Sequence, residues 1–356
     1  DLKESSVENG VVIIDTPTRL ELVPRPTAVC WHPHCGDDNE DRFIIANEDF
    51  KFKEFNSESK QCRNTTLTPA FGGPLTTIIP LPVDASQDGE KYYAYSTAEN
   101  VVGVGCLPLT GDPKNVMGLV AHPGSITGMT ISYCGQYMFS TGGKDLSANM
   151  WFIDTQKLPR GADQVTVQNN FLELLEGGSG GELHNDIIDY FYYCQLRTQG
   201  EDSMDDRSIT GKIPVEEIPH LVRAIGFYPS EEDIANMVNE VRYKHFMIDG
   251  AMEDHIGLND FIRLYINHRP IIPLTTASIE AALEVIKENA GVRADSIDWK
   301  SLKNILITEG EAFSDVELTS CLQALTGEAD KDDDHRLNAG IFSDHILGFE
   351  DFSDQP

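Results

Sequence analysis

The stretch that decides the fold runs from Ser208 to Val241 and reads SITGKIPVEEIPHLVRAIGFYPSEEDIANMVNEV. Counted as a 12-residue loop that begins two residues earlier, it has oxygen-bearing side chains at positions 1, 3 and 5, a glycine at position 6 and a glutamate at position 12: Asp206, Ser208, Thr210, Gly211 and Glu217. Calcium prefers several oxygen ligands, the sharp turn favours glycine, and the last carboxylate can bind the ion with both oxygens. The segment therefore has the composition of an ion-binding loop.

Two apolar stripes follow this loop at helical spacing. The residues recur at i, i+3, i+4 and i+7, and the two stripes are Ile218, Leu221, Val222, Ile225 and then Ile234, Met237, Val238, Val241. A helix predicted over 184–196 precedes the loop and carries Ile187, Ile188 and Phe191. A loop between helices with this spacing resembles an EF-hand of the calmodulin type.

Two interpretations of the loop remain open. In the first, it binds one calcium ion through the side chains of Asp206, Ser208, Thr210 and Glu217 and the carbonyl of Lys212. In the second, it has lost its ion, because Arg207 and Lys212 add positive charge to a site that should be anionic. No other cofactor is predicted.

Three further helix–loop–helix units follow with weaker loops. In the second, Arg242 to Asp260 is longer than an ion loop, and Asp254 stands where glycine belongs. The third has Ala290, Val292 and Ala294 at ligand positions, and alanine and valine side chains cannot bind calcium. The fourth has carboxylates in Asp330–Asp334, but it lacks the glycine and the closing glutamate, so we interpret it as a solvated acidic loop.

The apolar residues at loop position 8 survive in all four units. We predict that Ile213 pairs with Ile256, and Ile297 with Leu337, as short strands that join the loops of each lobe. The helical stripes of the second lobe are also kept: Ile279, Ala282, Leu283 and Ile286, then Leu318, Cys321, Leu322 and Leu325. This predicts one α-helical lobe over 184–272 and another over 273–356, retained for packing and partner binding.

The first 155 residues have the period of β-strands instead. His122 to Trp151, HPGSITGMTISYCGQYMFSTGGKDLSANMW, resembles one blade of a WD-repeat β-propeller, and two weaker units precede it at 27–60 and 73–110. The resemblance implies a hydrogen-bonded tetrad of His122, Thr141, Asp145 and Trp151. Three blades cannot close a propeller of four to eight blades, so residues 1–155 are predicted to be its last blades. Residues 156–183, with Gly177–Gly181, are predicted to be a linker in which the short apolar piece Phe171–Leu175 docks on a neighbour.

The charge limits the partners. The chain carries a formal charge of −31 over its 356 residues, most of it after residue 160, which argues against binding to nucleic acid or to an anionic membrane surface. A basic amphipathic helix is the expected partner of the acidic half. The seven cysteines have no framework spacing, as is typical of a reducing compartment such as the cytoplasm. The sequence contains no phosphate-binding loop or nucleophile elbow, and we predict that the protein is not an enzyme.

Two short clusters have alternative interpretations. Cys30 to Cys35, CWHPHC, could suggest zinc, but on a strand its two cysteines face opposite sides, which favours a strand of the first blade. Tyr190 to Tyr193, YFYY, could dock a partner through its aromatic rings, although a core role on the entering helix is favoured.

Together the two halves resemble the WD-repeat cilia- and flagella-associated proteins of the calmodulin- and spoke-associated complex, at the base of radial spokes. The segments that carry the resemblance are Pro26–Pro33, Asp189–Cys194, Arg223–Ser230 and Asp260–Arg269. It implies a scaffold in the ciliary or flagellar axoneme, part of the cytoskeleton, whose partners are other spoke-base subunits, with calmodulin as a further candidate. The alternative is a calcium-responsive regulator of ciliary beating that acts through Asp206–Glu217.

Overall fold

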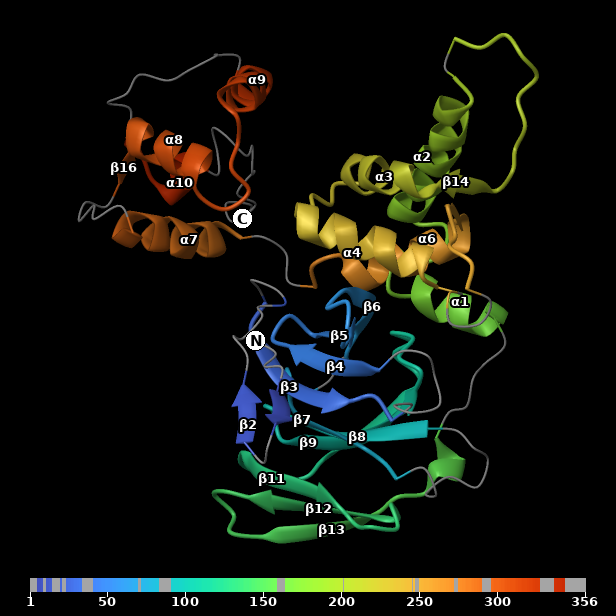
Figure 1. Ribbon diagram of the computed structural model, residues 1–356, viewed down its shortest axis with the longest axis vertical. Helices are drawn as coiled ribbons and strands as arrows, with labels where there is room; N and C mark the ends of the chain where they lie inside the picture. The colour runs from blue at the N-terminus through green and yellow to red at the C-terminus, as the bar shows by residue number, and fades with distance from the viewer. Residues whose placement is uncertain are drawn as a thin grey trace, which may run out of the picture. The chain divides into compact units, whose positions relative to one another are not determined.

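The computed structural model describes residues 5–8, 11–14, 20, 24–33, 41–69, 72–82, 91–158, 164–200, 202–244, 246, 250–271, 275–289, 296–326 and 336–342. These residues form an N-terminal region of small antiparallel sheets and a C-terminal helical region (Figure 1). The chain divides into two compact units, Asp1–Ile271 and Ile272–Pro356, which we call the first and the second unit. The first unit therefore combines the sheets with the first group of helices.

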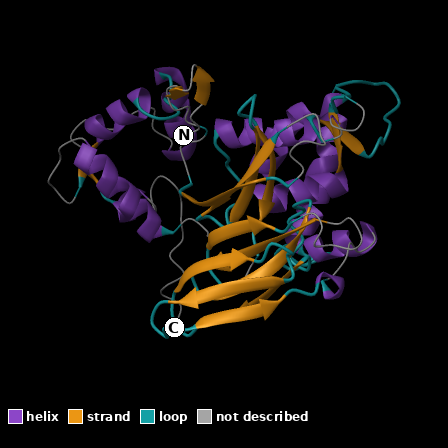
Figure 2. Ribbon diagram, turned by 60° about the horizontal axis from the view of Figure 1, so that its bottom comes forward, coloured by secondary structure: helices purple, strands orange, loops and turns teal. Residues whose placement is uncertain are grey.

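Three successive sheets make up most of the N-terminal region (Figure 2). A separate hairpin, β1 (Ser5–Glu8) and β2 (Val11–Ile14), precedes them. The first two sheets have four strands each and the third has three, always in the order of the sequence. Their strands are β3 (Pro26–Trp31), β4 (Arg42–Asn47), β5 (Lys51–Asn56) and β6 (Cys62–Leu67); β7 (Leu75–Pro80), β8 (Lys91–Thr97), β9 (Val101–Leu107) and β10 (Val116–Val120); and β11 (Ile126–Ile131), β12 (Tyr137–Gly142) and β13 (Ala148–Phe152).

The middle sheet is covered on both faces. Side chains alternate between the faces of a strand, so Tyr93 and Tyr95 of β8 pack into the core shared with the first sheet. Tyr92 and Ala94 of the same strand pack into the core shared with the third sheet. The three sheets therefore stack as layers, and their first strands β3, β7 and β11 lie at the contacts between layers. The described strands form no closed ring.

The helices of the first unit enclose one apolar core. The elements are α1 (Gln164–Leu172), α2 (Glu182–Thr198), β14 (Lys212–Pro214), the 3-10 turn Val215–Glu217, α3 (Ile218–Ala224), α4 (Glu231–Arg242), β15 (His255–Gly257) and α6 (Leu258–His268). The predicted stripes face this core, where Leu221, Met237 and Phe261 are fully buried. Ser230 caps α4 by accepting a hydrogen bond from the backbone N–H of Asp233.

Two sets of boundaries expected from the sequence need correction, one for the linker and one for the strand units. Residues 156–183, predicted to be a linker, contain the helix α1, and Phe171 and Leu175 are buried in the helical core. The sequence suggested a linker because glycines dominate its end, and the helix was missed, whereas the burial of Phe171 and Leu175 agrees with the expected docking of this apolar piece. The weaker strand units were also drawn too short: the first sheet extends to Leu67 and the second to Val120.

The second unit repeats the plan of the first group of helices. It contains α7 (Thr276–Asn289), β16 (Ile297–Asp298), α8 (Trp299–Thr308), α9 (Asp315–Thr326), β17 (Arg336–Leu337) and α10 (Ala339–Phe342). Its own core gathers Ile279, Leu283, Trp299, Leu302 and Leu322, among others. Ala282 and Cys321, which the sequence placed on the apolar stripes, are exposed.

The predicted pairing of the loops is confirmed in both units. Ile213 lies opposite Ile256 in the β14–β15 pair, and Ile297 lies opposite Leu337 in the β16–β17 pair. All four side chains are buried. Within the part of the chain that is described, no helix is long and apolar enough to span a membrane.

Candidate functional site

The predicted calcium loop lies between α2 and α3. Gly211 has a φ of +70°, a backbone conformation in which a glycine is favoured, and Ile213 is fully buried beside it. The loop therefore has the turn and the apolar anchor that the sequence predicted. Some of the oxygens that should face an ion have partners within the protein, whereas the side chains of Asp206 and Ser208 are exposed.

Glu217 would be the closing ligand, and its carboxylate forms an ion pair with the guanidinium of Arg197, in the last turn of α2. The side chain of Glu217 is only 13% exposed. The negative charge of Glu217 and burial together raise the pKa of the neighbouring Cys194 thiol to about 11, with burial the larger cause. A calcium ion would have to displace the guanidinium before Glu217 could bind it.

Two other predicted ligands, Thr210 and the carbonyl of Lys212, are also engaged within the protein. The hydroxyl of Thr210 donates to the carbonyl of Lys212 at 3.0 Å, so two of the predicted oxygens bond to each other. The side chain of Gln199 forms two hydrogen bonds with the backbone of Ser208. It donates to the carbonyl at 2.8 Å and accepts from the N–H at 3.0 Å. Arg207 donates to the carbonyl of Leu196 at 3.1 Å. This arrangement does not fit a calcium shell unless several of these bonds break.

The remaining loops offer no better site among the described residues. No group of three His, Cys, Asp or Glu side chains there could hold a metal ion. In the second loop, the N–H of Glu253 donates to the carbonyl of Arg242 at 3.1 Å. The ligand positions of the third loop and the acidic run Asp330–Asp334 lie outside the described residues, as does Cys35 of the cluster considered for zinc.

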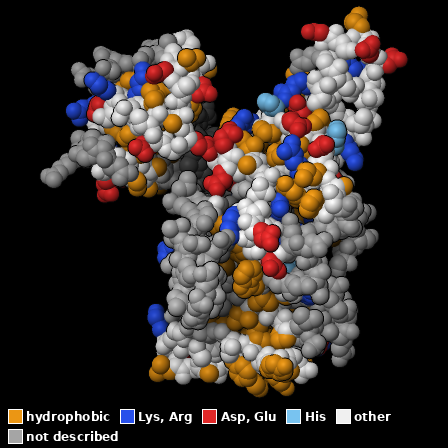
Figure 3. Space-filling model, viewed as in Figure 1, with side chains coloured by type: hydrophobic (Ala, Val, Ile, Leu, Met, Phe, Trp, Pro, Cys, Tyr) orange, Lys and Arg blue, Asp and Glu red, His pale blue; other side chains and the backbone are white. Residues whose placement is uncertain are grey.

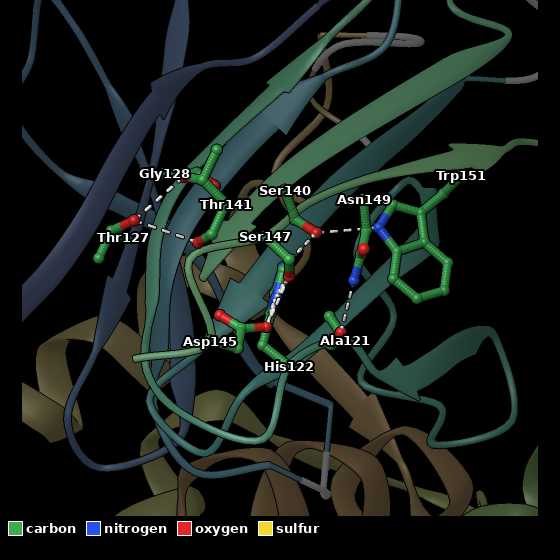
Figure 4. Close-up of polar contacts among 10 residues, drawn as sticks. All are labelled: Ala121, His122, Thr127, Gly128, Ser140, Thr141, Asp145, Ser147, Asn149 and Trp151. Atoms are coloured by element: carbon green, nitrogen blue, oxygen red, sulfur yellow. Dashed lines mark hydrogen bonds and ion pairs between the residues drawn. The ribbon is translucent and has the colours of Figure 1, made fainter. Parts of the chain in front are cut away.

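A second polar network holds the third sheet together (Figure 4). His122, which is 1% exposed, lies between two oxygens: its Nδ1 is 2.8 Å from Asp145 Oδ2, and its Nε2 is 2.8 Å from Ser140 Oγ. Trp151 Nε1 donates to the same Ser140 Oγ at 2.9 Å, and Ser147 donates to Asp145 at 2.6 Å. Because an indole can only donate, the consistent order of donation is Trp151 to Ser140, Ser140 to His122 and His122 to Asp145.

The network corrects one predicted member. Thr141 was expected to supply the hydroxyl, but the neighbouring Ser140 does so. Adjacent residues of a strand face opposite sides, and Thr141 is exposed, with its Oγ1 3.0 Å from that of Thr127. The strict alternation in β12, where Met138 and Ser140 are buried, is the signal that could have identified the right residue.

Serine, histidine and aspartate in this order could suggest a hydrolytic triad. Two observations argue for a structural role instead. Ser140 is fully buried, and its Oγ already accepts the hydrogen bond of Trp151. We therefore interpret these residues as a polar tie between strands.

Comparison with known proteins links this chain to cilia. Residues 182–347 match the family model described as the CFAP251 C-terminal domain. The cilia- and flagella-associated protein 251 of Tetrahymena thermophila is 34% identical over 359 residues, which cover 93% of this chain and 36% of that protein. The mouse protein of the same name is 35% identical over 306 residues, which cover 85% of this chain and 23% of that protein. These findings support the cilia- and flagella-associated protein 251 family.

The chain spans about a third or less of the length of these two relatives. Human calmodulin-like protein 6 is also similar, with 26% identity over 151 residues, which cover 42% of this chain and 75% of that protein. The ciliary relatives are named for their association with cilia and flagella.

Sequence reasoning missed the polar contacts that join the first group of helices to the first sheet. Glu240 of α4 accepts hydrogen bonds from the backbone N–H of Thr65 in β6 at 3.1 Å and pairs with His268 of α6 at 2.9 Å. The ammonium of Lys51 in β5 donates to the carbonyl of His268. The guanidinium of Arg63 lies 3.9 Å from the centre of the Tyr243 ring. The contacts between helices and sheet pair residues about 175 to 217 positions apart in the sequence, so no local pattern reveals them.

A cavity of about 290 Å³ lies at the same junction. Glu54 of β5 lines it and is 4% exposed. Burial raises the pKa of Glu54 to about 7, although Arg42, 3.7 Å away, opposes the shift. This carboxyl is therefore a group at the junction whose charge responds to pH near neutrality.

Proposed function

We propose that this protein is a non-enzymatic scaffold of the ciliary or flagellar axoneme, in which β-propeller blades are joined to two EF-hand-like lobes that hold a partner helix. Its likeness to ciliary proteins along nearly the whole chain is the observation that carries the proposal. The cytoskeletal and spoke-base location, and the other subunits of that complex as partners, follow from the resemblance of the sequence. Calmodulin is a further candidate partner.

Three observations support the propeller in this proposal. The sheets pack face to face in sequence order, with their first strands at the contacts. The third sheet contains the tie of His122, Ser140, Asp145 and Trp151. Apolar side chains also remain exposed on the outer sheets, at Trp31 in β3 and at Met150 and Phe152 in β13. Figure 3 shows hydrophobic side chains gathered at the lower end of the molecule, where the third sheet lies. Additional blades would cover such faces.

The EF-hand-like lobes are supported by their paired loops and by the similarity to calmodulin-like protein 6. The ion pair between Arg197 and Glu217 favours a lobe that keeps its shape without calcium. The alternative, a calcium-responsive regulator acting through Asp206–Glu217, retains one observation in its favour, the positive φ of Gly211.

Detergent extraction of motile cilia tests the scaffold. Tagged chain is expressed in cells that assemble cilia, and axonemes are extracted in a chelator or in calcium. The scaffold predicts that the protein stays with the axoneme in both buffers, as judged by immunoblot. Release into the detergent-soluble fraction in both buffers contradicts the scaffold, and retention only in calcium favours the regulator.

A further inference from the structure

The outward face of α2 has a composition that the folding of this unit does not require. Tyr190, Tyr192, Tyr193 and Leu196 are 41%, 42%, 50% and 44% exposed. Among the described helices, α2 alone exposes more than one large apolar side chain. The inward face, with Ile187, Phe191 and Cys194, already fills the core. The core interpretation of the tyrosine cluster therefore holds for Phe191 only.

Acidic residues continue the same face toward the start of the helix. Glu182, Asp186, Asp189, Tyr193 and Leu196 are separated by four, three, four and three residues, which is the spacing of one stripe along a helix. All five side chains are exposed. The stripe is thus negatively charged along its first half and apolar along its second half.

Stabilisation of the helix does not account for these acids. Carboxylates near a helix N-terminus are favourable, but the effect is confined to the first turn. Glu182 lies in the first turn, whereas Asp186 and Asp189 lie beyond it. Among the ion pairs of the described residues, none involves any of the three. Their charges face solvent on a helix whose one arginine pairs with Glu217.

We propose that the outward face of α2 docks a basic helical segment of a partner protein, with lysines or arginines on Asp186 and Asp189 and apolar residues on Tyr193 and Leu196. The proposal rests on the scaffold function and names the surface that holds the partner. Charge complementarity favours a basic segment, because the carboxylates of this face belong to a chain with a net charge of −31, and opposite charges attract a partner. Tyrosines are enriched at the centres of protein interfaces, and the guanidinium of an arginine can pack against the face of their rings.

Pairing with a second copy of the chain is less favourable. A copy would bring its own acids to the interface, and like charges placed together oppose association. Light scattering on residues 1–356 separates the two occupants: a dimer that the replacement of Tyr193 and Leu196 by alanine abolishes would overturn the basic-segment proposal.

The direct test uses a synthetic 18-residue amphipathic helix of leucine, lysine and arginine as a fluorescent probe for residues 1–356. Two double variants alter the stripe: Asp186→Asn with Asp189→Asn, and Tyr193→Ala with Leu196→Ala. Each is expected to weaken probe binding about tenfold, and the loss in the charge variant should shrink at high salt.

Matched controls lie on other exposed surfaces of the first unit. Glu58→Gln with Glu232→Gln removes two charges, and Tyr133→Ala with Tyr228→Ala removes two exposed rings. Both are expected to bind the probe within about twofold of the unaltered chain, because they leave the stripe intact. Equal weakening by the controls, or unchanged binding by the stripe variants, would overturn the proposal. Circular dichroism checks that every variant is folded.

Axoneme retention separates this proposal from the scaffold function. A variant with all four stripe substitutions should be released by detergent where the unaltered chain is retained. If both are retained, the scaffold stands and the α2 surface is wrong. If the unaltered chain is itself released, the scaffold function fails first.

Discussion

The two groups of paired helices share a plan but differ in what surrounds them. Each joins its loops through a short strand pair, Ile213 with Ile256 and Ile297 with Leu337. The first group also packs against α1 and bonds to the first sheet through Glu240, and the chain divides only after Ile271. The second group has a core of its own. The comparison teaches that the same plan of helices and paired loops forms in both groups, while only the first is built into a larger unit.

The largest expected effects come from substitutions that each destabilise one of the two units. Phe171→Ala should destabilise the first unit, and Trp299→Ala the second, by about 3–5 kcal/mol each, because both side chains are fully buried. Thermal unfolding of residues 1–356, followed by calorimetry, should show two transitions. Each variant should lower the midpoint temperature of only one of them. A single transition that both variants lower equally would contradict the division into two units.

The buried carboxyl at the junction between sheet and helices gives the next largest effect. The pKa of Glu54 is raised from 4.5 to about 7 in the folded state. Its contribution to stability is therefore full below the unfolded pKa and is lost as the pH rises through about 7. Glu54→Gln should stabilise the first unit by roughly 2–3 kcal/mol at pH 8 and by less than about 1 kcal/mol at pH 5.

The second unit serves as the internal control for this variant. Its transition should be unchanged at both pH values, because Glu54 belongs to the first unit. Equal stabilisation at pH 5 and pH 8 would show that the effect does not come from the charge of Glu54.

The buried serine of the third sheet tests whether sheets and helices of the first unit unfold together. Ser140→Ala should lower the free energy of unfolding of the first unit by about 1–3 kcal/mol, since His122 Nε2 and the indole N–H of Trp151 each lose a partner. Thr141→Ala is the matched control, because Thr141 follows Ser140 in the same strand and is exposed. It should change the free energy of unfolding by no more than about 0.5 kcal/mol. Loss of sheet signal alone, with the helices still folded, would contradict a shared transition.

The sequence predicted those features that depend on local periodicity. The 2-residue period predicted three strand units, the 3.6-residue period predicted the helices, and the apolar residue at loop position 8 predicted the partners Ile213 and Ile256. It failed where the two faces of a strand had to be told apart, since Thr141 was chosen over Ser140, and it missed the helix α1 in the segment predicted to be a linker. The Arg197–Glu217 pair was missed because the loop motif says which residues can bind an ion, but not which cation lies beside them.

The smallest expected effect concerns that cation. In the first group of helices, Arg197 supplies the positive charge next to Glu217 that an ion would supply in a calcium-binding loop. Arg197→Gln removes this charge and should cost no more than about 1 kcal/mol of stability, because the arginine is partly exposed. It also leaves Glu217, Asp206 and the glycine turn at Gly211 as they are. Terbium luminescence, excited through nearby tyrosines and competed with calcium, should then report weak binding in the variant and none in the unaltered chain. Arg197→Lys keeps a positive charge at this position and should behave like the unaltered chain. If terbium binds the unaltered chain as tightly as the glutamine variant, the guanidinium does not take the place of an ion, and the two groups of helices differ in calcium response for another reason.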